Sequence, residues 1–206
     1  AIRNKTSLML ENLANGQWIY NTDESNEFLY KERTLAAYLS AKKLLTEKIQ
    51  IQAGLRYEHT WTESNQLTQR QISRSHYGRF YPTLHLNWQL KDNQNLALAA
   101  NWGIERPNFN DLNPFRIYTS TTNYMTGNPY LAAAYTCNVE INYSNGKGLY
   151  AVLYNNYGKG ETGWRTQFLE NGSQVTGPYD GLHHEKTGFY ANYNRNVLTW
   201  LNLNIG

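Results

Sequence analysis

The chain has 206 residues, 19 of them Lys or Arg and 16 Asp or Glu, and its net charge of +3 is too small to indicate nucleic acid as a partner. Its hydrophobic residues, 40% of the total, never form a run of about 18, which excludes a transmembrane helix. The single cysteine, Cys137, excludes an internal disulfide. The polar start shows no signal peptide, as expected of a cytosolic protein or of a mature or partial chain.

The first segments are weakly patterned. Residues 7–13 predict a weak strand and residues 14–26, which are mostly polar, a loop. Residues 28–42 alternate, with Leu35 and Leu39 on one parity, although Leu, Ala, Lys and Glu also favour helix. Because the neighbouring segments alternate too, strand is the preferred interpretation of 28–42.

Residues 48–62 have two clearly different faces. Ile49, Ile51 and Leu55 share one parity, whereas Gln52 and Arg56 share the other. Successive side chains of a strand point to opposite faces, so this segment predicts a strand with an apolar and a polar side. In a soluble sandwich the apolar side would face a core, and in a transmembrane barrel it would face lipid.

The middle of the chain continues the alternation. Residues 63–76 are polar and predict a long loop, followed by a strand at 80–90 in which Pro82 indicates an edge or a bulge. Residues 91–94 predict a tight turn into a strand at 96–104. Residues 106–130 hold three of the five prolines and no periodicity, so they predict a second long loop.

The last third is rich in strands. They are predicted at residues 135–143, 149–157, 164–170, 174–179, 184–194 and 197–205. Asn145-Gly146 predicts a type I′ hairpin turn, and residues 158–163 predict a break in the strand that precedes them. Asn171-Gly172 predicts another hairpin turn, and Arg195-Asn196 predicts the last turn.

Connections between these nine or ten strands alternate between short and long. This asymmetry is typical of an all-β, antiparallel, up-and-down transmembrane barrel and is not expected of a Greek-key sandwich. On this interpretation the lipid-facing residues are Ile49, Ile51, Leu55, Leu84, Leu86, Trp88, Leu96, Leu98, Trp102, Val139 and Ile141.

No catalytic or metal-binding motif stands out, and the chain is expected to be a non-enzyme without a cofactor. His183 and His184 are adjacent, so a strand would point them in opposite directions. His85 lies on a polar face, where a lumen residue is a simpler interpretation than a general base. Cys137 shares parity with apolar neighbours and is interpreted as a small apolar filler.

Charged residues on the polar faces are candidates for contacts inside a barrel. Arg56, Glu58, Glu105 and Glu140 either guide a ligand or merely hydrate the inner wall. The long loop 106–130 is the best candidate for a recognition element. The predicted ligand-binding residues are Arg56, Glu58, Glu105, Arg106, Asn113, Tyr118 and Tyr124.

Several short motifs occur in an ordered series. They are Gly54-Leu55-Arg56-Tyr57-Glu58, Tyr81-Pro82-Thr83-Leu84, Arg106-Pro107, Leu112-Asn113-Pro114-Phe115 and Gly127-Asn128-Pro129-Tyr130-Leu131. From Phe28 to Ile205 this series resembles the TonB-dependent receptor superfamily, in particular outer-membrane barrel proteins common in Bacteroidetes. Ala132-Ala133-Ala134 replaces the Lys-Pro or similar pair that the family shows there.

The resemblance implies a barrel of about 22 strands in the bacterial outer membrane, with a plug in its lumen. Residues 1–206 would then be an internal piece of one barrel domain, without the plug. The implied function is energised uptake of a siderophore, glycan or peptide. Implied partners are outer-membrane lipid, the TonB system through a plug outside this chain, and a surface lipoprotein or other subunit. The alternatives are a soluble β-rich carbohydrate-binding module and a small complete barrel enzyme.

Overall fold

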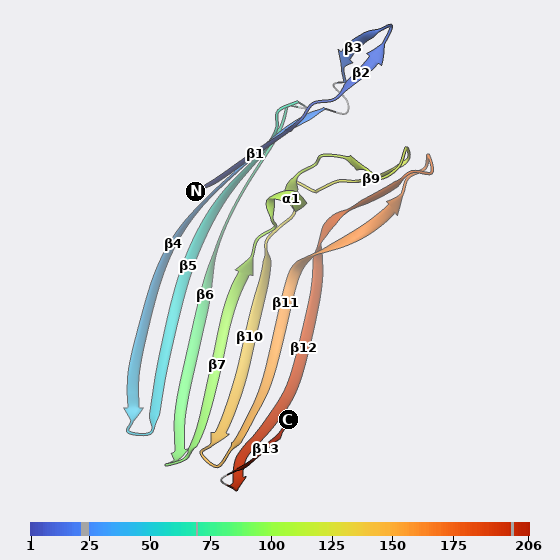
Figure 1. Cartoon of the computed structure of the whole chain (residues 1–206). Helices are drawn as coiled ribbons and strands as arrows, with labels where there is room; N and C mark the ends of the chain where they lie inside the picture. Colours follow the sequence, from blue (N-terminus) through green and yellow to red (C-terminus); the bar gives the residue numbers. More distant parts are fainter. Residues whose placement is uncertain (22–24, 69, 199) are drawn as a thin grey trace.

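The computed structural model describes residues 1–21, 25–68, 70–198 and 200–206. These residues form one extended sheet, a separate hairpin and a single-turn helix (Figure 1). The elements are β1 (Ile2–Leu8), β2 (Glu11–Ala14), β3 (Gln17–Tyr20), β4 (Asn26–Thr46), β5 (Ile49–Gln66), β6 (Gln71–Lys91), β7 (Gln94–Glu105), α1 (Phe109–Leu112), β8 (Ile117–Tyr118), β9 (Asn123–Met125), β10 (Ala134–Asn145), β11 (Leu149–Phe168), β12 (Gln174–Leu198) and β13 (Leu201–Ile205). Within these ranges no helical segment has the length and apolar character needed to cross a bilayer.

Strands that follow one another in sequence are also neighbours in the sheet. The order is β1-β4-β5-β6-β7-β10-β11-β12, and each of these pairs is antiparallel. The tight turns after β4, β6 and β10 all lie at one end of the sheet, and the long connections lie at the other (Figure 1). The predicted all-β, up-and-down architecture is therefore confirmed. The predicted alternation of short and long connections holds only in part, because only residues 67–70 separate β5 from β6 and only residues 169–173 separate β11 from β12.

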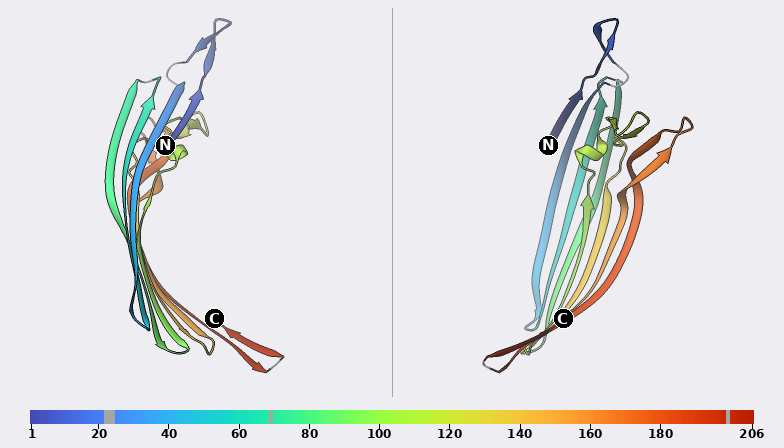
Figure 2. Two further views of the ribbon diagram at one scale, coloured as in Figure 1. Left: turned by 90° about the vertical axis from the view of Figure 1, so that its left-hand side faces the viewer. Right: turned by 45° about the vertical axis from the view of Figure 1, so that its right-hand side comes forward.

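The alternating sequence produces two different faces. Residues paired directly across strands share a face, and the register places Ile51 opposite Leu86, Leu86 opposite Leu98, and Leu98 opposite Ile141. All eleven residues predicted to face lipid lie on this one face. The sheet is curved, and the loop that carries α1 lies on its concave side (Figure 2).

The apolar face is the convex one. Glu58 and Thr60 point to Arg106 on the concave side, and Leu55 and Tyr57 have the opposite parity on the same strand. Among the described residues, the elements in extensive contact are hydrogen-bonded neighbours, so no second sheet covers Leu84, Leu86 or Leu98. Within the described residues this face is therefore not the core of a sandwich.

The convex face becomes more polar at β11 and β12. Asn155 lies on it and donates through Nδ2 to Glu185 Oε1 at 3.1 Å and to Thr187 Oγ1 at 2.8 Å. Since the three groups satisfy one another, their polarity is compensated within the sheet.

A small hydrophobic core lies on the concave side, near the long connections. It joins Phe28 and Tyr30 of β4 to three loop residues, Leu112, Phe115 and Leu131. The aromatic rings of Phe28 and Phe109 stack with centroids 5.7 Å apart. This core fixes the loop between β7 and β10 against the inner wall.

Some strand predictions were wrong in their limits. The predicted strand 7–13 is divided between the end of β1 and the start of β2. The predicted loop 14–26 contains β3, and its residues 22–24 lie outside the described residues. Residues 63–76, expected to be a loop, mostly extend β5 and β6, whose polar side chains pair across strands: Glu63 opposite Arg74 and Ser64 opposite Ser73. Polarity was misread there as loop character, because both faces of these strands are polar.

Three turn predictions also need correction. The type I′ turn at Asn145-Gly146 is wrong, because the positive φ of 105° falls on Gly148. The expected break at 158–163 is a bulge around Gly160, through which β11 continues to Phe168. Residues Arg195 and Asn196 belong to β12, which ends at Leu198.

Pro82 marks the point where the sheet opens. It pairs with Leu55 of β5, whereas the pairing of β6 with β7 stops at Thr83. Proline has no N–H to donate to a neighbouring strand, and within the described residues β6 pairs with β7 only from Thr83 to Lys91. The predicted edge position of Pro82 is confirmed, and Arg106 leaves β7 beside the opening.

Candidate functional site

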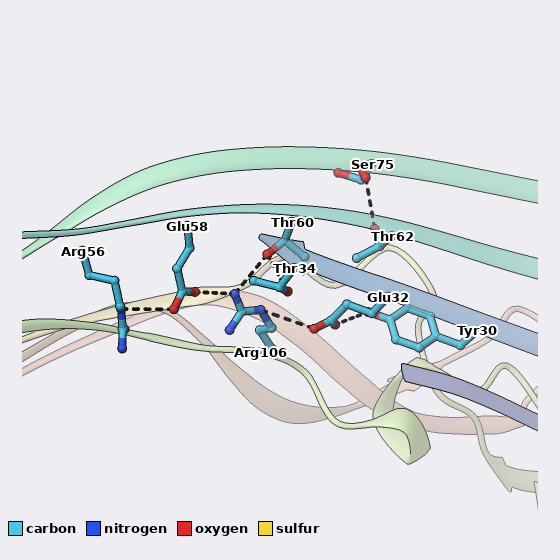
Figure 3. A network of polar contacts seen from close by, with 9 residues as sticks. All are labelled: Tyr30, Glu32, Thr34, Arg56, Glu58, Thr60, Thr62, Ser75 and Arg106. Carbon is cyan, nitrogen blue, oxygen red and sulfur yellow. Dashed lines mark hydrogen bonds and ion pairs between the residues drawn. The ribbon is translucent and has the colours of Figure 1, made fainter. Parts of the chain in front are cut away.

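Arg106 is the centre of a polar network on the concave wall. It follows the last residue of β7 and points back across the wall toward β5 and β4 (Figure 3). Its Nη2 donates to Glu58 Oε2 at 2.7 Å and to Thr60 Oγ1 at 3.0 Å. Its Nε lies 3.6 Å from Glu32 Oε1, which adds an ion pair with β4. One guanidinium therefore ties the start of the long loop to two strands.

Further contacts extend this network along the wall. Arg56 Nε lies 3.1 Å from Glu58 Oε1, so Glu58 stands between two guanidinium groups. The Tyr30 hydroxyl donates to Glu32 Oε2 at 2.8 Å, and the Thr34 and Thr60 hydroxyls are 3.1 Å apart. The register explains this gathering, because Glu32 lies opposite Thr62 and Thr34 lies opposite Thr60.

The network is largely shielded from water. The side chains of Glu58 and Glu32 are 12% and 11% exposed, and that of Arg106 is 23% exposed. Burial is the largest single influence and disfavours the charged guanidinium, but the interactions with Glu58 and Tyr77 together outweigh it and raise the pKa of Arg106 above its ordinary value. Arg106 therefore stays positive and anchors both carboxylates.

Two polar hollows adjoin Arg106. One, of about 410 Å³, is lined among others by Glu105, Arg106, Asp111, Glu161 and Trp164. The other, of about 420 Å³, lies toward the core and is lined by Tyr30, Tyr77, Tyr130 and Tyr135 as well as Arg106. Both offer hydrogen-bonding groups beside aromatic rings, which suits a polar ligand of moderate size.

The structure brings together only part of the predicted ligand-binding set. Arg56, Glu58 and Arg106 form the network, and Glu105 lines the adjoining hollow. Asn113 instead shapes the loop: its carbonyl accepts from Gly127 N at 2.9 Å, and its side chain caps Phe115 N at 3.3 Å.

Tyr118 and Tyr124 form a second group, apart from the Arg106 network. They pair across β8 and β9 with ring centroids 5.5 Å apart, and Arg116 lies 5.1 Å from the Tyr124 ring. Strand β9 also pairs with β12 in parallel, so these rings stand at the tip of the long loop, against the extension of β12.

A polar ladder on the same wall was missed by the sequence analysis. His184 Nδ1 lies 2.7 Å from Glu161 Oε2, and its Nε2 contacts Asn156. Asn156 contacts Asn138, whose Nδ2 donates to Asn101 at 3.0 Å. These residues come from β12, β11, β10 and β7, and only the cross-strand register places them in one row.

The remaining candidates take modest roles. Glu140 accepts from Asn142 Nδ2 at 2.6 Å, and His85 lines a small hollow with Gln50 and Gln52 on the concave face. Cys137 is half-buried, opposite Trp102 on the convex face. Throughout the described part of the chain, His, Cys, Asp and Glu form no group of three that could hold a metal ion.

Comparison with known proteins gives one family. The sequence profile described as "Outer membrane protein beta-barrel family" matches residues 1–206. A search of curated proteins found no match.

Several solved structures resemble the fold. The siderophore receptor PirA from Pseudomonas aeruginosa is 12% identical with a TM-score of 0.55, over 98% of this chain and 48% of that chain. The Serratia marcescens hemophore receptor HasR, solved with its hemophore HasA and heme, is 10% identical with a TM-score of 0.61, over 93% and 38%. The copper transporter OprC is 10% identical with a TM-score of 0.58, over 96% and 32%. The chain therefore spans less than half the length of these proteins.

Proposed function

The chain belongs to the outer membrane protein beta-barrel family, and on this premise we propose that it forms part of the barrel wall of a receptor that imports a scarce nutrient. The apolar convex face would meet lipid and the polar concave face would line the lumen. The likeness to receptor and transporter barrels supports this assignment and a non-enzymatic role.

The observation that carries the proposal is the inward fold of the loop between β7 and β10. Arg106 joins this loop to Glu58 and Glu32 on the wall, and Leu112 and Phe115 pack it against Phe28. A long loop held inside the wall narrows the lumen at the mouth and brings polar hollows into the path of a solute. A purely structural barrel has no need of this arrangement.

The ligand class follows from the chemistry of the hollows and of the loop tip. Hydroxyl, amide and carboxylate groups beside Tyr and Trp rings suit a siderophore, a glycan or a peptide. The structures with a similar fold are named for a siderophore, a hemophore with heme, and copper. We place the recognition rings at Tyr118 and Tyr124, with Arg106 setting the position of the loop.

The proposed partners follow from the same assignment. Import against a gradient needs energy, and we assign its supply to the TonB system acting through a plug outside this chain. A surface lipoprotein or another outer-membrane subunit could cover the mouth.

Uptake by cells tests the proposal. A strain lacking the gene, complemented with the full-length protein, would be supplied with labelled ferric siderophores, oligosaccharides and peptides in turn. We expect one of these classes to be taken up only by complemented cells with an intact TonB system. Tyr118→Ala combined with Tyr124→Ala should weaken that uptake at unchanged protein abundance. If the uptake of all three classes were the same with and without the gene, the proposal would be contradicted.

A further inference from the structure

Cationic side chains gather on the convex face at the end with the long connections. Cross-strand pairs place Arg3 opposite Lys31, Lys31 opposite Glu63, and Glu63 opposite Arg74. These positions have the opposite parity to Glu32 and Thr60, which point to the concave side. We call this set the basic patch: Arg3, Lys5, Lys31, Arg33 and Arg74, with the carboxylates Glu27 and Glu63 among them.

The basic patch begins where the apolar surface ends. Along the convex side of β4, Leu39 and Leu35 are followed by Arg33 and Lys31. On β5 the apolar positions run from Ile49 to Tyr57, a length that fits the about 9–11 residues of a bilayer-spanning strand. The cations therefore stand at the height of the lipid headgroups.

Aromatic side chains form a border where the two zones meet, and Trp61 of this border lies directly opposite Arg33 of the patch. The ring centroids of Tyr57 and Phe80 are 4.9 Å apart. The ring centroid of His59 is 4.3 Å from that of Trp61 and 5.8 Å from that of His76. Aromatic side chains of this kind mark the membrane interface in outer-membrane barrels. Since long loops of such barrels face outward from the cell, this border belongs to the outer leaflet.

The positive charge of the patch is only partly compensated. Glu63 accepts from Lys31 Nζ and from Arg74 Nε, both at 2.9 Å, and Lys5 pairs with Glu27. In the part of the chain that the structure describes, Arg3 and Arg33 form no ion pair, and Arg33 is exposed. Five cations thus face two carboxylates.

The patch is also hollowed. A depression of about 650 Å³ is lined by Lys31, Arg33, Leu35, Trp61, Arg74 and His76, among others. Guanidinium groups hold phosphate oxygens through two parallel hydrogen bonds, whereas Leu35 and Trp61 offer an apolar floor. A phosphate joined to a sugar and an acyl chain fits this depression, because the phosphate can bind the guanidinium groups and the acyl chain can pack on the apolar floor.

We propose that the basic patch binds the phosphorylated headgroup of an outer-leaflet glycolipid, with Arg33 and Arg74 on the phosphate and Trp61 beside the sugar and acyl chain. This inference rests on the orientation given by the proposed function, in which the convex face meets lipid. The site lies on the opposite face from the Arg106 network and serves a different molecule from the imported nutrient.

Retention of lipid A by the full-length protein tests the site. The protein, purified in detergent, would be incubated with diphosphoryl lipid A and washed, and bound lipid would be counted by native mass spectrometry. We expect Arg33→Gln combined with Arg74→Gln to retain about tenfold less lipid, since two charge-assisted contacts are lost. Lys43→Gln is the matched control, because Lys43 lies on the same face opposite Ile51, at the other end of β4. It should retain as much as the wild type.

Two further arms keep the result decisive. The wild type should retain chemically dephosphorylated lipid A about tenfold less than the diphosphoryl form, whether or not the double variant folds. Arg33→Lys combined with Arg74→Lys should retain more lipid than the Gln pair. Equal retention of the two lipid A forms, or unchanged retention by a folded Gln pair, would overturn the proposal. Nutrient uptake, measured separately, should be unchanged in the Gln pair, so that failure here does not affect the proposed function.

Discussion

Arg106 Nη2 lies 2.7 Å from Glu58 Oε2, although the two residues are 48 positions apart in the sequence. Three intervening features make this contact possible: the pairing of β5 with β6, the opening of the sheet at Pro82, and the departure of the chain from β7. The pair therefore links the geometry of the wall to the position of the long loop, and it is the natural place to perturb both.

Removing the guanidinium should destabilise the barrel and release the loop. We expect Arg106→Gln to lower the free energy of unfolding by about 2–3 kcal/mol, because in this shielded site Glu32 would lose its ion pair and Glu58 would keep only Arg56 as a charged partner. In a Glu58→Gln background the loss should be smaller by about 1 kcal/mol. Urea titration in detergent of the wild type, the two single variants and the double variant measures both losses.

The control for this measurement is Lys147→Gln, at the exposed turn between β10 and β11. Its effect should stay within about 0.5 kcal/mol. If Arg106→Gln proved no more harmful than Lys147→Gln, the network would not hold the loop in place.

Acidification should remove the contribution of Glu63 to the stability of the fold. Glu63 lies in the basic patch, beyond the apolar positions of β5. Hydrogen bonds from Lys31 and Arg74 hold the pKa of Glu63 below its ordinary value. Such a group stabilises the fold above its ordinary pKa and loses this effect as the pH falls through the depressed pKa. The stability difference between wild type and Glu63→Gln should therefore be constant from neutral pH to about pH 5 and vanish in stronger acid.

Salt gives an independent check on the same pair of proteins. High ionic strength screens exposed charges, so about 1 M NaCl should shrink the difference at neutral pH. If the stability difference between the wild type and Glu63→Gln grew on acidification, Glu63 would not stabilise the fold through its charge.

The turn between β10 and β11 should be intolerant of a side chain. Gly148 has a φ of 105°, and an added Cβ would stand 1.8 Å from the backbone oxygen of Asn194. Gly148→Ala should cost more than the about 1–2 kcal/mol expected of the φ angle alone. Gly172→Ala, where φ is 79° and the space is open, should cost only that amount. Equal losses of folded protein in thermal denaturation would refute the close contact.

Adjacent residues on β6 should respond in opposite ways to a positive charge. Leu84 lies on the convex face, opposite Ala53 and Ala100, and His85 lies on the concave face, opposite Gln52 and Ala99. Leu84→Arg should lower the stability in a bilayer by about 2–4 kcal/mol, whereas His85→Arg should be nearly neutral. Folding into lipid vesicles, followed by heat-modifiable migration on gels, compares the two. Comparable losses would show that the faces are not distinguished by lipid.

Much of this fold is predictable because strand alternation is a local property. Ile49 to Tyr57 and Leu84 to Trp88 display their two faces without reference to the rest of the chain, and the structure keeps those faces. Residues 63–76 were misjudged because their strands are polar on both faces, so no apolar period reveals them. Gly148 was missed because Gly146 and Gly148 both lie in this turn, and the sequence does not show which of them takes the positive φ.

The candidate site was only partly predictable for a related reason. Arg56, Glu58 and Arg106 could be named from their charge and polar setting, but the identity of their partners depends on register. Glu32 joins them because it lies opposite Thr62, and His184 meets Glu161 across a bulge. Tyr118 and Tyr124 are separated from Arg106 because β9 pairs with β12, and this pairing could not be predicted from the sequence.

The central claim is that the convex face meets hydrocarbon and the concave face meets water. Spin labels at Ile51→Cys and Gln52→Cys, each in a Cys137→Ala background of the full-length protein in lipid vesicles, test it directly by electron paramagnetic resonance. We predict that the label at position 51 is relaxed mainly by oxygen, which dissolves in lipid, and the label at position 52 mainly by a water-soluble nickel chelate. Equal or reversed accessibility at the two positions would contradict the account.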